Sequence, residues 1–368
     1  MILAFAVVPL LAWLYLLLGR GLFWLARERD TQEGPAPAAW PSVVAVVPAR
    51  DEADVIVNSV GSLMAQDYRG SFRIIVVDDQ SSDGTGDDAR ALGCDVITGS
   101  PRPSGWTGKL WAVSQGIAAA GTPDYLWLTD ADIAHTPDNL SQLVARAEAQ
   151  RFVLTSLMAR LHCDGFAEKL LIPAFVFFFD MLFPFGWVND PRNNLAAAAG
   201  GCMLIRRDAL ERAGGIAAIR GEIIDDCAMG RLLKRQGPIW LGLTNRSVSL
   251  RPYFFGEIRT MVARSAYAQL AYSPLLLAGT VLGMALVYAA APILAVFAGG
   301  AARWMGVAAW ALMALAIVPM LRFYRLSPLW GLALPVIGAL YGLFTLDSAI
   351  QHWRGRGGMW KGRAQARA

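Results

Sequence analysis

The chain has 368 residues, of which 55% are hydrophobic and only 17% are charged, and its mean hydropathy is +0.40. This composition is too apolar for a soluble enzyme and too polar for a protein made only of membrane helices. The formal net charge is +4, and arginines cluster beside apolar segments, which suits an anionic membrane surface rather than nucleic acid. The four cysteines form no C-x-x-C pair, so neither a zinc site nor a disulfide framework is expected.

An apolar segment begins the chain, and we predict a transmembrane helix within residues 1–25. A cleaved signal peptide is the alternative. It is disfavoured because no basic residue precedes the apolar run, whereas Arg20, Arg27 and Arg29 follow it. By the positive-inside rule these arginines place the next domain in the cytoplasm. Residues 26–41, which are rich in Pro and Ala, form a predicted linker.

Residues 42–248 alternate short apolar runs with helical patterns. Strands are predicted at residues 42–48, 72–79, 94–97, 125–129 and 196–205, and helices at residues 55–65, 111–120, 141–150, 208–213 and 225–233. Strands that alternate with helices at this spacing predict βαβ units. We therefore expect an α/β domain with a mainly parallel sheet.

Residues 170–188 are strongly apolar but contain Pro173, Pro184 and Asp180. A charge at the bilayer centre costs about 2.5–3.5 kcal/mol on insertion scales. We therefore expect an interfacial or partly buried element near the membrane. A hydrophobic core helix fits the same pattern equally well.

The C-terminal third is predicted to meet the membrane. Residues 249–273 form a predicted amphipathic interface segment, and residues 274–350 hold three apolar stretches of transmembrane length. Residues 351–368 form a basic tail. Three crossings would place this tail on the opposite side of the membrane from the α/β domain, against the positive-inside rule. One stretch is therefore expected to be re-entrant or interfacial, or residues 328–350 to form a shallow hairpin.

The apolar run Tyr125–Leu128 leads into two carboxylates one residue apart, Asp130 and Asp132. Open α/β folds place ligands at the carboxyl ends of strands. In a continuing strand both side chains would point to one face and repel, so that one stays protonated unless a cation lies between them. Mg²⁺ or Mn²⁺ with oxygen ligands and phosphate fits this arrangement. The alternative is a polar loop in which Asp caps the next helix.

The sequence contains two further acidic pairs: Asp78/Asp79, which precedes Asp130 and Asp132, and Asp225/Asp226, which follows them. Their spacing, with VVPARDEADVI before and VVDDQSSDGT between, resembles the family 2 glycosyltransferases with a GT-A-type nucleotide-sugar domain, over residues 43–269. The phrase IIDDCAMGRLL, the N-terminal apolar segment and the closing WKGR are more similar still to the hopene-associated glycosyltransferases, a bacterial membrane branch.

The resemblance implies donor-binding residues. Pro48, Ala49, Arg50 and Glu52 match the loop that cradles uracil and ribose. Asp79 matches the acid that bonds the uracil ring, and an N-cap of the following turn is its alternative role.

A lysine follows in the GK-x-x-A segment. Lys109 matches the donor contact that neutralises the pyrophosphate, and a solvated surface lysine is the alternative. Asp130 and Asp132 match the D-x-D that holds the divalent metal on the donor diphosphate, with Asp130 also contacting the donor.

The resemblance also implies the residues that act on the acceptor. Asp226 matches the second acid of the family's E-D pair, whose implied role is the general base that takes the proton of the acceptor hydroxyl. Asp225 replaces the glutamate of that pair. The Q/R-x-x-R-W acceptor motif is not clearly present, and the nearest candidates for acceptor contacts are Asp225, Arg264, Tyr267 and Gln269.

These implications describe a multi-pass enzyme of the bacterial inner membrane that faces the cytoplasm. It is expected to be a metal-dependent inverting hexosyltransferase with a UDP-sugar donor and a lipid acceptor, such as a hopanoid. Its expected partners are the donor, the lipid and the bilayer but not nucleic acid, and the sequence indicates no particular protein partner. Two alternatives stay open: a nucleotidyl or phosphosugar transferase on the same fold, and a non-catalytic membrane protein that binds a nucleotide-sugar.

Overall fold

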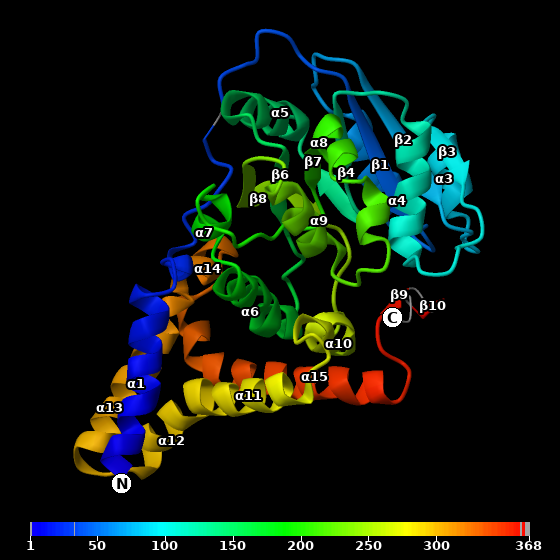
Figure 1. The fold of residues 1–368 in the computed structure, drawn as a ribbon. Helices are drawn as coiled ribbons and strands as arrows, with labels where there is room; N and C mark the ends of the chain where they lie inside the picture. The colour runs from blue at the N-terminus through cyan, green and yellow to red at the C-terminus, as the bar shows by residue number, and fades with distance from the viewer. Residues whose placement is uncertain (1, 33, 361–362, 365–368) are drawn as a thin grey trace. The chain divides into compact units, whose positions relative to one another are not determined.

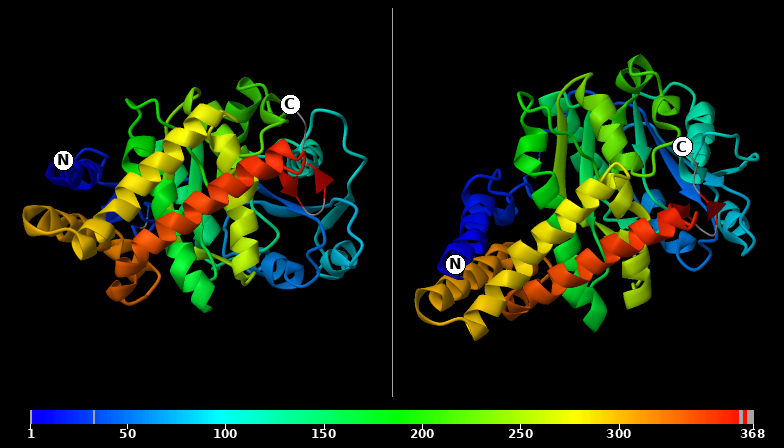
Figure 2. Two further views of the ribbon diagram at one scale, coloured as in Figure 1. Left: turned by 90° about the horizontal axis from the view of Figure 1, so that it is seen from below. Right: turned by 60° about the horizontal axis from the view of Figure 1, so that its bottom comes forward.

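The computed structural model describes residues 2–32, 34–360 and 363–364, and the chain divides into two compact units. The first, the α/β unit, comprises Glu28–His162, Trp187–Arg251 and Met359–Ala368. The second, the helical unit, comprises Met1–Arg27, Cys163–Gly186 and Pro252–Gly358. Figures 1 and 2 show the elements of both units. Of the predicted basic tail, residues 361–362 and 365–368 lie outside the described residues.

The α/β unit carries the strands and most of the shorter helices. Its strands are β1 (Val43–Ala49), β2 (Phe72–Asp78), β3 (Asp95–Thr98), β4 (Tyr125–Leu128), β5 (Ile133–His135), β6 (Leu154–Arg160), β7 (Met203–Arg206), β8 (Ile239–Ser249) and the short pair β9 (Met359–Trp360) and β10 (Arg363–Ala364). Its helices are α2 (Ile56–Met64), α3 (Thr85–Ala91), α4 (Gly108–Ala119), α5 (Asn139–Gln150), α8 (Arg207–Arg212), η2 (Ile216–Ile219) and α9 (Asp225–Lys234).

The main sheet of this unit is mixed. Its strand order is β3-β2-β1-β4-β7-β6-β8-β5, with parallel pairing of β1 with β2 and β4, of β2 with β3, and of β6 with β8. In contrast, β7 runs antiparallel to β4 and β6, and β5 runs antiparallel to β8. The expectation of a mainly parallel sheet is therefore wrong in this half. A strand that runs parallel to its neighbour needs a crossover connection that returns the chain to the end of the sheet where that neighbour begins. The chain instead enters β7 beside the carboxyl end of β4, so β7 runs antiparallel to it.

The predicted strand at residues 196–205 is also shorter than expected, because only Met203–Arg206 pairs with the sheet. Residues 196–202 approach it as irregular chain. This leaves Gly200 and Gly201 in a loop beside the end of β4, which becomes important for the site.

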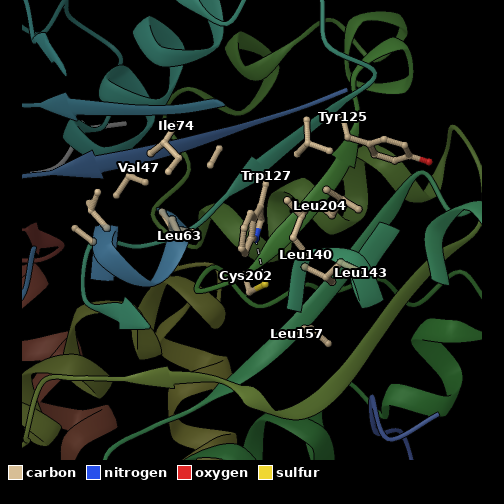
Figure 3. Close-up of a cluster of buried hydrophobic side chains, with 14 of the residues drawn as sticks. Val47, Leu63, Ile74, Tyr125, Trp127, Leu140, Leu143, Leu157, Cys202 and Leu204 are labelled. Carbon is tan, nitrogen blue, oxygen red and sulfur yellow. Dashed lines mark hydrogen bonds between the residues drawn. The ribbon is translucent and has the colours of Figure 1, made fainter. Parts of the chain in front are cut away.

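The core of the α/β unit explains the apolar runs in the sequence. Every residue of β1 and β4 is buried, as expected for strands that are covered on both faces. Figure 3 shows Trp127 of β4 among aliphatic side chains that include Leu140 of α5 and Leu63 of α2. Because β1, β2 and β4 are parallel and in register, their carboxyl ends lie at one edge of the sheet.

The helical unit holds the remaining elements. They are α1 (Ile2–Leu18), η1 (Phe23–Leu25), α6 (Phe166–Leu182), α10 (Phe255–Gln269), α11 (Pro274–Met284), η3 (Ala285–Ala289), α12 (Ala290–Phe297), α13 (Gly300–Ala316), α14 (Val318–Phe323), η4 (Pro328–Ala333) and α15 (Leu334–Trp353). The short helix α7 (Phe185–Asn189) contains the boundary between the two units.

Three helical stretches are long and apolar enough to cross a membrane: Pro274–Phe297, Gly300–Phe323 and Pro328–Trp353. This agrees with the predicted C-terminal spans. The N-terminal helix α1 is apolar but has only 17 residues. At 1.5 Å per residue it reaches roughly 25 Å, less than a hydrocarbon core of about 30 Å. A crossing within residues 1–25 therefore stays a prediction.

Within the predicted segment 170–188, α6 is a largely buried helix of the helical unit. Phe177 packs against Phe23, and Phe178 packs against Tyr341 with ring centroids 4.9 Å apart. The buried Asp180 accepts a hydrogen bond from the Phe185 N–H. These contacts favour the core-helix alternative for this segment.

Candidate active site

Lys109, at the start of α4, connects two of the acidic pairs. Its Nζ lies 2.7 Å from Oδ1 of Asp130, which follows β4, and 3.2 Å from Oδ2 of Asp225, which begins α9. Burial alone would lower the pKa of Lys109, but Asp130 and Asp225 raise it above its ordinary value. Lys109 is therefore a fixed positive charge, and the alternative of a solvated surface lysine is not observed.

A hollow open to solvent lies around this lysine. Its walls come from the end of β1, from α4, from the segment after β4, from the glycine loop before β7 and from α9. The lining residues include Pro48, Leu110, Thr129, Gly200, Ile216 and Met229. Of the predicted site residues, Pro48, Lys109, Asp130 and Asp225 thus meet at one place in the α/β unit.

Asp226 lies in the first turn of α9, beside the glycine loop. Its carboxylate accepts hydrogen bonds from the N–H of Gly200 at 3.1 Å and of Cys227 at 2.7 Å. Burial, and then Asp225, raise the pKa of Asp226 to about 6, while Lys109 acts in the opposite direction. A side chain at position 200 would meet Lys109 Nζ at 3.3 Å and Asp226 at 3.6 Å, so the close approach favours glycine here.

Asp130 and Asp132 do not continue a strand, because β4 ends at Leu128. The premise that pleating directs both side chains to one face is therefore wrong. Burial, and then the charge of Asp130, raise the pKa of Asp132 to about 6. Neither caps the next helix, since α5 begins after Asp138. The polar-loop alternative with a capping role is thus not observed.

This pair suits a divalent metal only together with further ligands. Carboxylate oxygens are the ligands that Mg²⁺ and Mn²⁺ prefer. Burial, and then the nearby negative charges of Asp130 and Glu52, raise the pKa of Asp132, so a cation here would favour its ionised form. Within residues 2–32, 34–360 and 363–364, no group of three or more His, Cys, Asp or Glu could hold a metal ion alone. Phosphate oxygens of a bound donor would complete such a site.

The loop after β1 is tied to the end of β2. The Asp79 N–H donates to the Ala49 carbonyl, and the Arg50 guanidinium donates to the Asp79 carbonyl at 2.5 Å. The Arg50 Nη1 also lies 3.6 Å from the buried Asp79 carboxylate. Asp78 caps the following turn, because its carboxylate accepts the Ser81 N–H at 3.0 Å.

Sequence reasoning missed Arg251, which follows β8. Its guanidinium pairs with the buried Glu52 and lies 3.3 Å from Asp54, and its charge also opposes the rise in the pKa of Asp132. The sequence offered one signal for Arg251, namely an arginine directly after a strand in a domain whose strand ends carry many acidic residues. The partners are distant in the sequence, so only the fold could pair them.

Three predicted acceptor residues lie elsewhere, in α10 of the helical unit. Arg264 and Gln269 are exposed, whereas Tyr267 is buried and packs against Tyr272 and Trp353. None of the three lines the hollow in the α/β unit. Their contact with an acceptor stays a prediction.

Comparison with known proteins places this geometry in context. Residues 44–214 match the family model Glycosyl transferase family 2. A mannosyltransferase from Pyrobaculum calidifontis, solved in complex with GDP-Man and Mn²⁺, aligns over 97% of this chain and 100% of its own at 20% identity and a TM-score of 0.59. This likeness confirms the expected GT-A-like α/β fold.

A glucosyl-3-phosphoglycerate synthase from Mycobacterium tuberculosis, solved with Mn²⁺, UDP-glucose and phosphoglyceric acid, covers 63% of this chain and 79% of its own. Its sequence identity is 21% and its TM-score is 0.42. The comparison with curated protein sequences found no match.

Proposed function

We propose that this chain, in which residues 44–214 match the Glycosyl transferase family 2 model, is a membrane-bound inverting glycosyltransferase that moves a sugar from a nucleotide-sugar to a lipid alcohol. The observation that carries the proposal is the meeting of Lys109, Asp130 and Asp225 at the hollow, with the raised-pKa Asp226 beside them. A cation beside a hollow can compensate the negative charge that develops on a leaving diphosphate. A carboxylate whose pKa is raised can accept the proton of an attacking hydroxyl.

The donor would bind along the carboxyl ends of β1, β2 and β4. Asp79 and Arg50 would contact the base, Pro48, Ala49 and Glu52 would shape its cradle, and Lys109 would contact the diphosphate. Two arguments support this division: Asp79 is held between strand ends by Arg50, and Lys109 lines the open hollow. We expect a UDP-sugar, as the resemblance implies. The mannosyltransferase of similar fold carries GDP-Man, so both nucleotides belong in the test.

A divalent cation, Mg²⁺ or Mn²⁺, would be held by Asp130 and Asp132 together with donor phosphates. When bound, it would stabilise the charge that develops on the diphosphate. Mn²⁺ in the mannosyltransferase complex agrees with this proposal. Lys109, already paired with Asp130, would add a second positive charge on the same oxygens.

Asp226 would act as the general base in one displacement. The acceptor hydroxyl oxygen would form a bond to the anomeric carbon while its proton passes to Asp226. The bond from that carbon to the diphosphate oxygen would break, and the diphosphate would leave with the electron pair. One displacement inverts the anomeric centre. General-base help of this kind is typically worth about 10²–10⁴-fold in rate.

The lipid acceptor and the membrane location rest on the helical unit. Its three apolar helices are long enough to cross a bilayer, and large side chains such as Leu275, Phe297 and Trp304 are strongly exposed on them. An acceptor with an apolar tail, such as a hopanoid or another polyprenyl-derived lipid, would reach the enzyme from this surface. By the positive-inside rule the α/β unit would face the cytoplasm of a bacterial inner membrane.

The test uses full-length protein in nanodiscs, labelled UDP- and GDP-sugars, and a bacterial lipid extract. We expect a glycolipid, identified by mass analysis, with release of nucleoside diphosphate and dependence on Mg²⁺ or Mn²⁺ that a chelator abolishes. Asp226→Asn and Asp132→Ala should lower transfer at least about 100-fold. Release of pyrophosphate would instead identify a nucleotidyl transferase. Tight donor binding without turnover would identify a non-catalytic binding protein.

A further inference from the structure

A buried polar cluster adjoins the proposed active site in the α/β unit through Thr129, which also lines the hollow, and none of its members was predicted to act. Its centre is the imidazole of His135 in β5, which is only 5% exposed. Around it lie Thr129 after β4, Asn139 at the start of α5, and Ser247 in β8. The ring also lies 4.7 Å from that of Trp127, whose Nε1–H donates to the Cys202 thiol (Figure 3).

The hydrogen bonds of this cluster define one tautomer of the histidine. The Thr129 hydroxyl donates its single proton to the Gly201 carbonyl at 2.9 Å. It can therefore only accept from His135 Nε2, which lies 2.9 Å away and must carry the proton. On the other side, the Asn139 amide nitrogen lies 3.2 Å from Nδ1 and can only donate to it, and the Ser247 hydroxyl lies 2.9 Å from the same atom. His135 is thus neutral and protonated at Nε2.

These bonds lead from the histidine to the proposed catalytic groups. Thr129 directly precedes Asp130 in the chain, and Gly201 directly follows Gly200, whose N–H donates to Asp226. Two consecutive glycines leave the backbone with unusual conformational freedom, so the Thr129 bond to Gly201 is an anchor that side-chain packing cannot replace. The loop has a second anchor, the Ser156 hydroxyl, which bonds both polar groups of the Ala199 backbone.

We propose that His135 is a positioning residue of the transfer reaction: through Thr129 it holds the Gly200–Gly201 loop, and with it Asp226, at a fixed spacing from Asp130 and Lys109. This inference rests on the proposed function. His135 touches neither donor nor acceptor in this scheme. A displacement of about 1 Å at reacting groups can lower a rate about 100-fold, so such an anchor has a measurable effect.

Thr155 offers a matched control for Thr129. It is fully buried in the neighbouring strand β6, and its hydroxyl has no hydrogen-bond partner among the residues that the structure describes. Threonine to valine at position 129 therefore removes the hydrogen bonds to His135 and Gly201, whereas the same substitution at position 155 removes no hydrogen bond. A purely structural cluster would lose activity in proportion to stability, whereas a positioning role lowers kcat at unchanged stability.

The experiment compares Thr129→Val, Thr129→Ser and Thr155→Val in the full-length protein in nanodiscs. We expect Thr129→Val to lower kcat about 10- to 100-fold with donor KM within about 3-fold and a Tm close to wild type. Thr129→Ser keeps the hydroxyl and should retain kcat within about 3-fold, and Thr155→Val should match wild type. Equal kcat for Thr129→Val and Thr155→Val, or equal losses in Thr129→Ser and Thr129→Val, would overturn the proposal.

A second pair of variants addresses the histidine itself. His135→Gln can still present an N–H to Thr129, and we expect it to recover at least several-fold of the kcat lost in His135→Phe. In ¹⁵N-histidine-labelled wild type, the ring of His135 should show a protonated Nε2 and a bare Nδ1. A protonated Nδ1, or no recovery by glutamine when both variants fold, would reject the role. Wild type without any transfer would reject the proposed function itself, whereas an active wild type confines the failure to the positioning role.

Discussion

The ammonium group of Lys109 lies between the carboxylates of Asp130 and Asp225, 2.7 Å from the first and 3.2 Å from the second. Lys109, at the start of α4, thereby connects the end of β4 to the start of α9. A carboxylate pair without that cation would leave half-buried negative charge uncompensated.

We therefore predict that Lys109→Met lowers both stability and transfer. The Tm should fall by several degrees at pH 7, and kcat should fall at least about 100-fold, because the diphosphate loses its compensating charge. Adding Asp225→Asn to this variant should restore part of the Tm, since one of the two uncompensated charges is removed, but not kcat. Thermal unfolding and steady-state rates of the two single variants and the double variant provide the measurement. A double variant as unstable as Lys109→Met would show that the charge pairing does not stabilise the fold.

The pKa of Asp226, raised to about 6, gives opposite pH dependences for activity and stability. As a general base it must be ionised, so transfer should fall as the pH drops through about 6. The folded protein binds this proton more tightly than the unfolded chain does. The carboxylate therefore destabilises the fold above pH 6, and this destabilisation is relieved as the pH falls towards the ordinary value near 4.

Asp226→Asn is accordingly expected to be almost inactive yet more heat-stable than wild type at pH 7 to 8. Its Tm should depend less on pH between 4 and 7. The pKa of Asp132 is also raised to about 6, so its carboxylate destabilises the fold over the same pH range. The matched comparison therefore measures the Tm against pH for Asp226→Asn, Asp132→Asn and the double variant. A lower Tm for Asp226→Asn at pH 8 would contradict the raised pKa.

The donor pocket gives a prediction that separates base recognition from turn structure. Asp79→Asn should raise donor KM about 10- to 100-fold with little change in kcat, because Asp79 acts on the base and not on the reacting atoms. Asp78→Asn is the control: Asp78 caps the following turn through the Ser81 N–H, so its loss should lower Tm without changing base preference. Calorimetric titration with UDP and GDP measures the affinity for each base, and thermal unfolding measures the Tm. An unchanged UDP affinity in Asp79→Asn would remove this residue from the donor site.

Local patterns in the sequence predicted the three acidic pairs and the strands that carry them, because buried parallel strands and their polar ends leave a strong local signal. They could not predict the basic partners of those acids or of Glu52. Lys109 reaches Asp225, and Arg251 reaches Glu52, through the order of strands in the sheet. The antiparallel insertion of β7 was missed for the same reason, since strand direction depends on the path of the connection.

His135 belongs to none of the motifs that carry the resemblance. The structure buries it in a strand, bonded on both ring nitrogens. Tyr267 shows the converse, since it was considered for acceptor contacts and packs inside the helical unit. Burial of single polar or aromatic residues depends on which elements pack together, and short motifs carry no information on that.

The last prediction concerns which apolar helices enter the bilayer. The amphipathic helix α10 packs along the C-terminal half of α15, from the contact of Phe255 with Phe344 to that of Tyr267 with Trp353, and Arg259 pairs with Asp347 between them. The other side of α10 exposes charged residues, which include Glu257 and Arg264. A crossing by this half of α15 would carry those charges into hydrocarbon, at about 2.5–3.5 kcal/mol for each central charge.

We therefore predict that Pro274–Phe297 and Gly300–Phe323 cross the bilayer, whereas the C-terminal half of α15 lies in the headgroup region. Two crossings return the basic tail to the side of the α/β unit, as the positive-inside rule requires. Spin labels at the exposed positions Ile293, Ile350 and Met64, each introduced as cysteine in a variant without native cysteines, report depth through their accessibility to oxygen and to a nickel chelate. We expect a deep label at 293, a shallow one at 350 and an aqueous one at 64. A label at 350 as deep as that at 293 would show that α15 crosses the membrane.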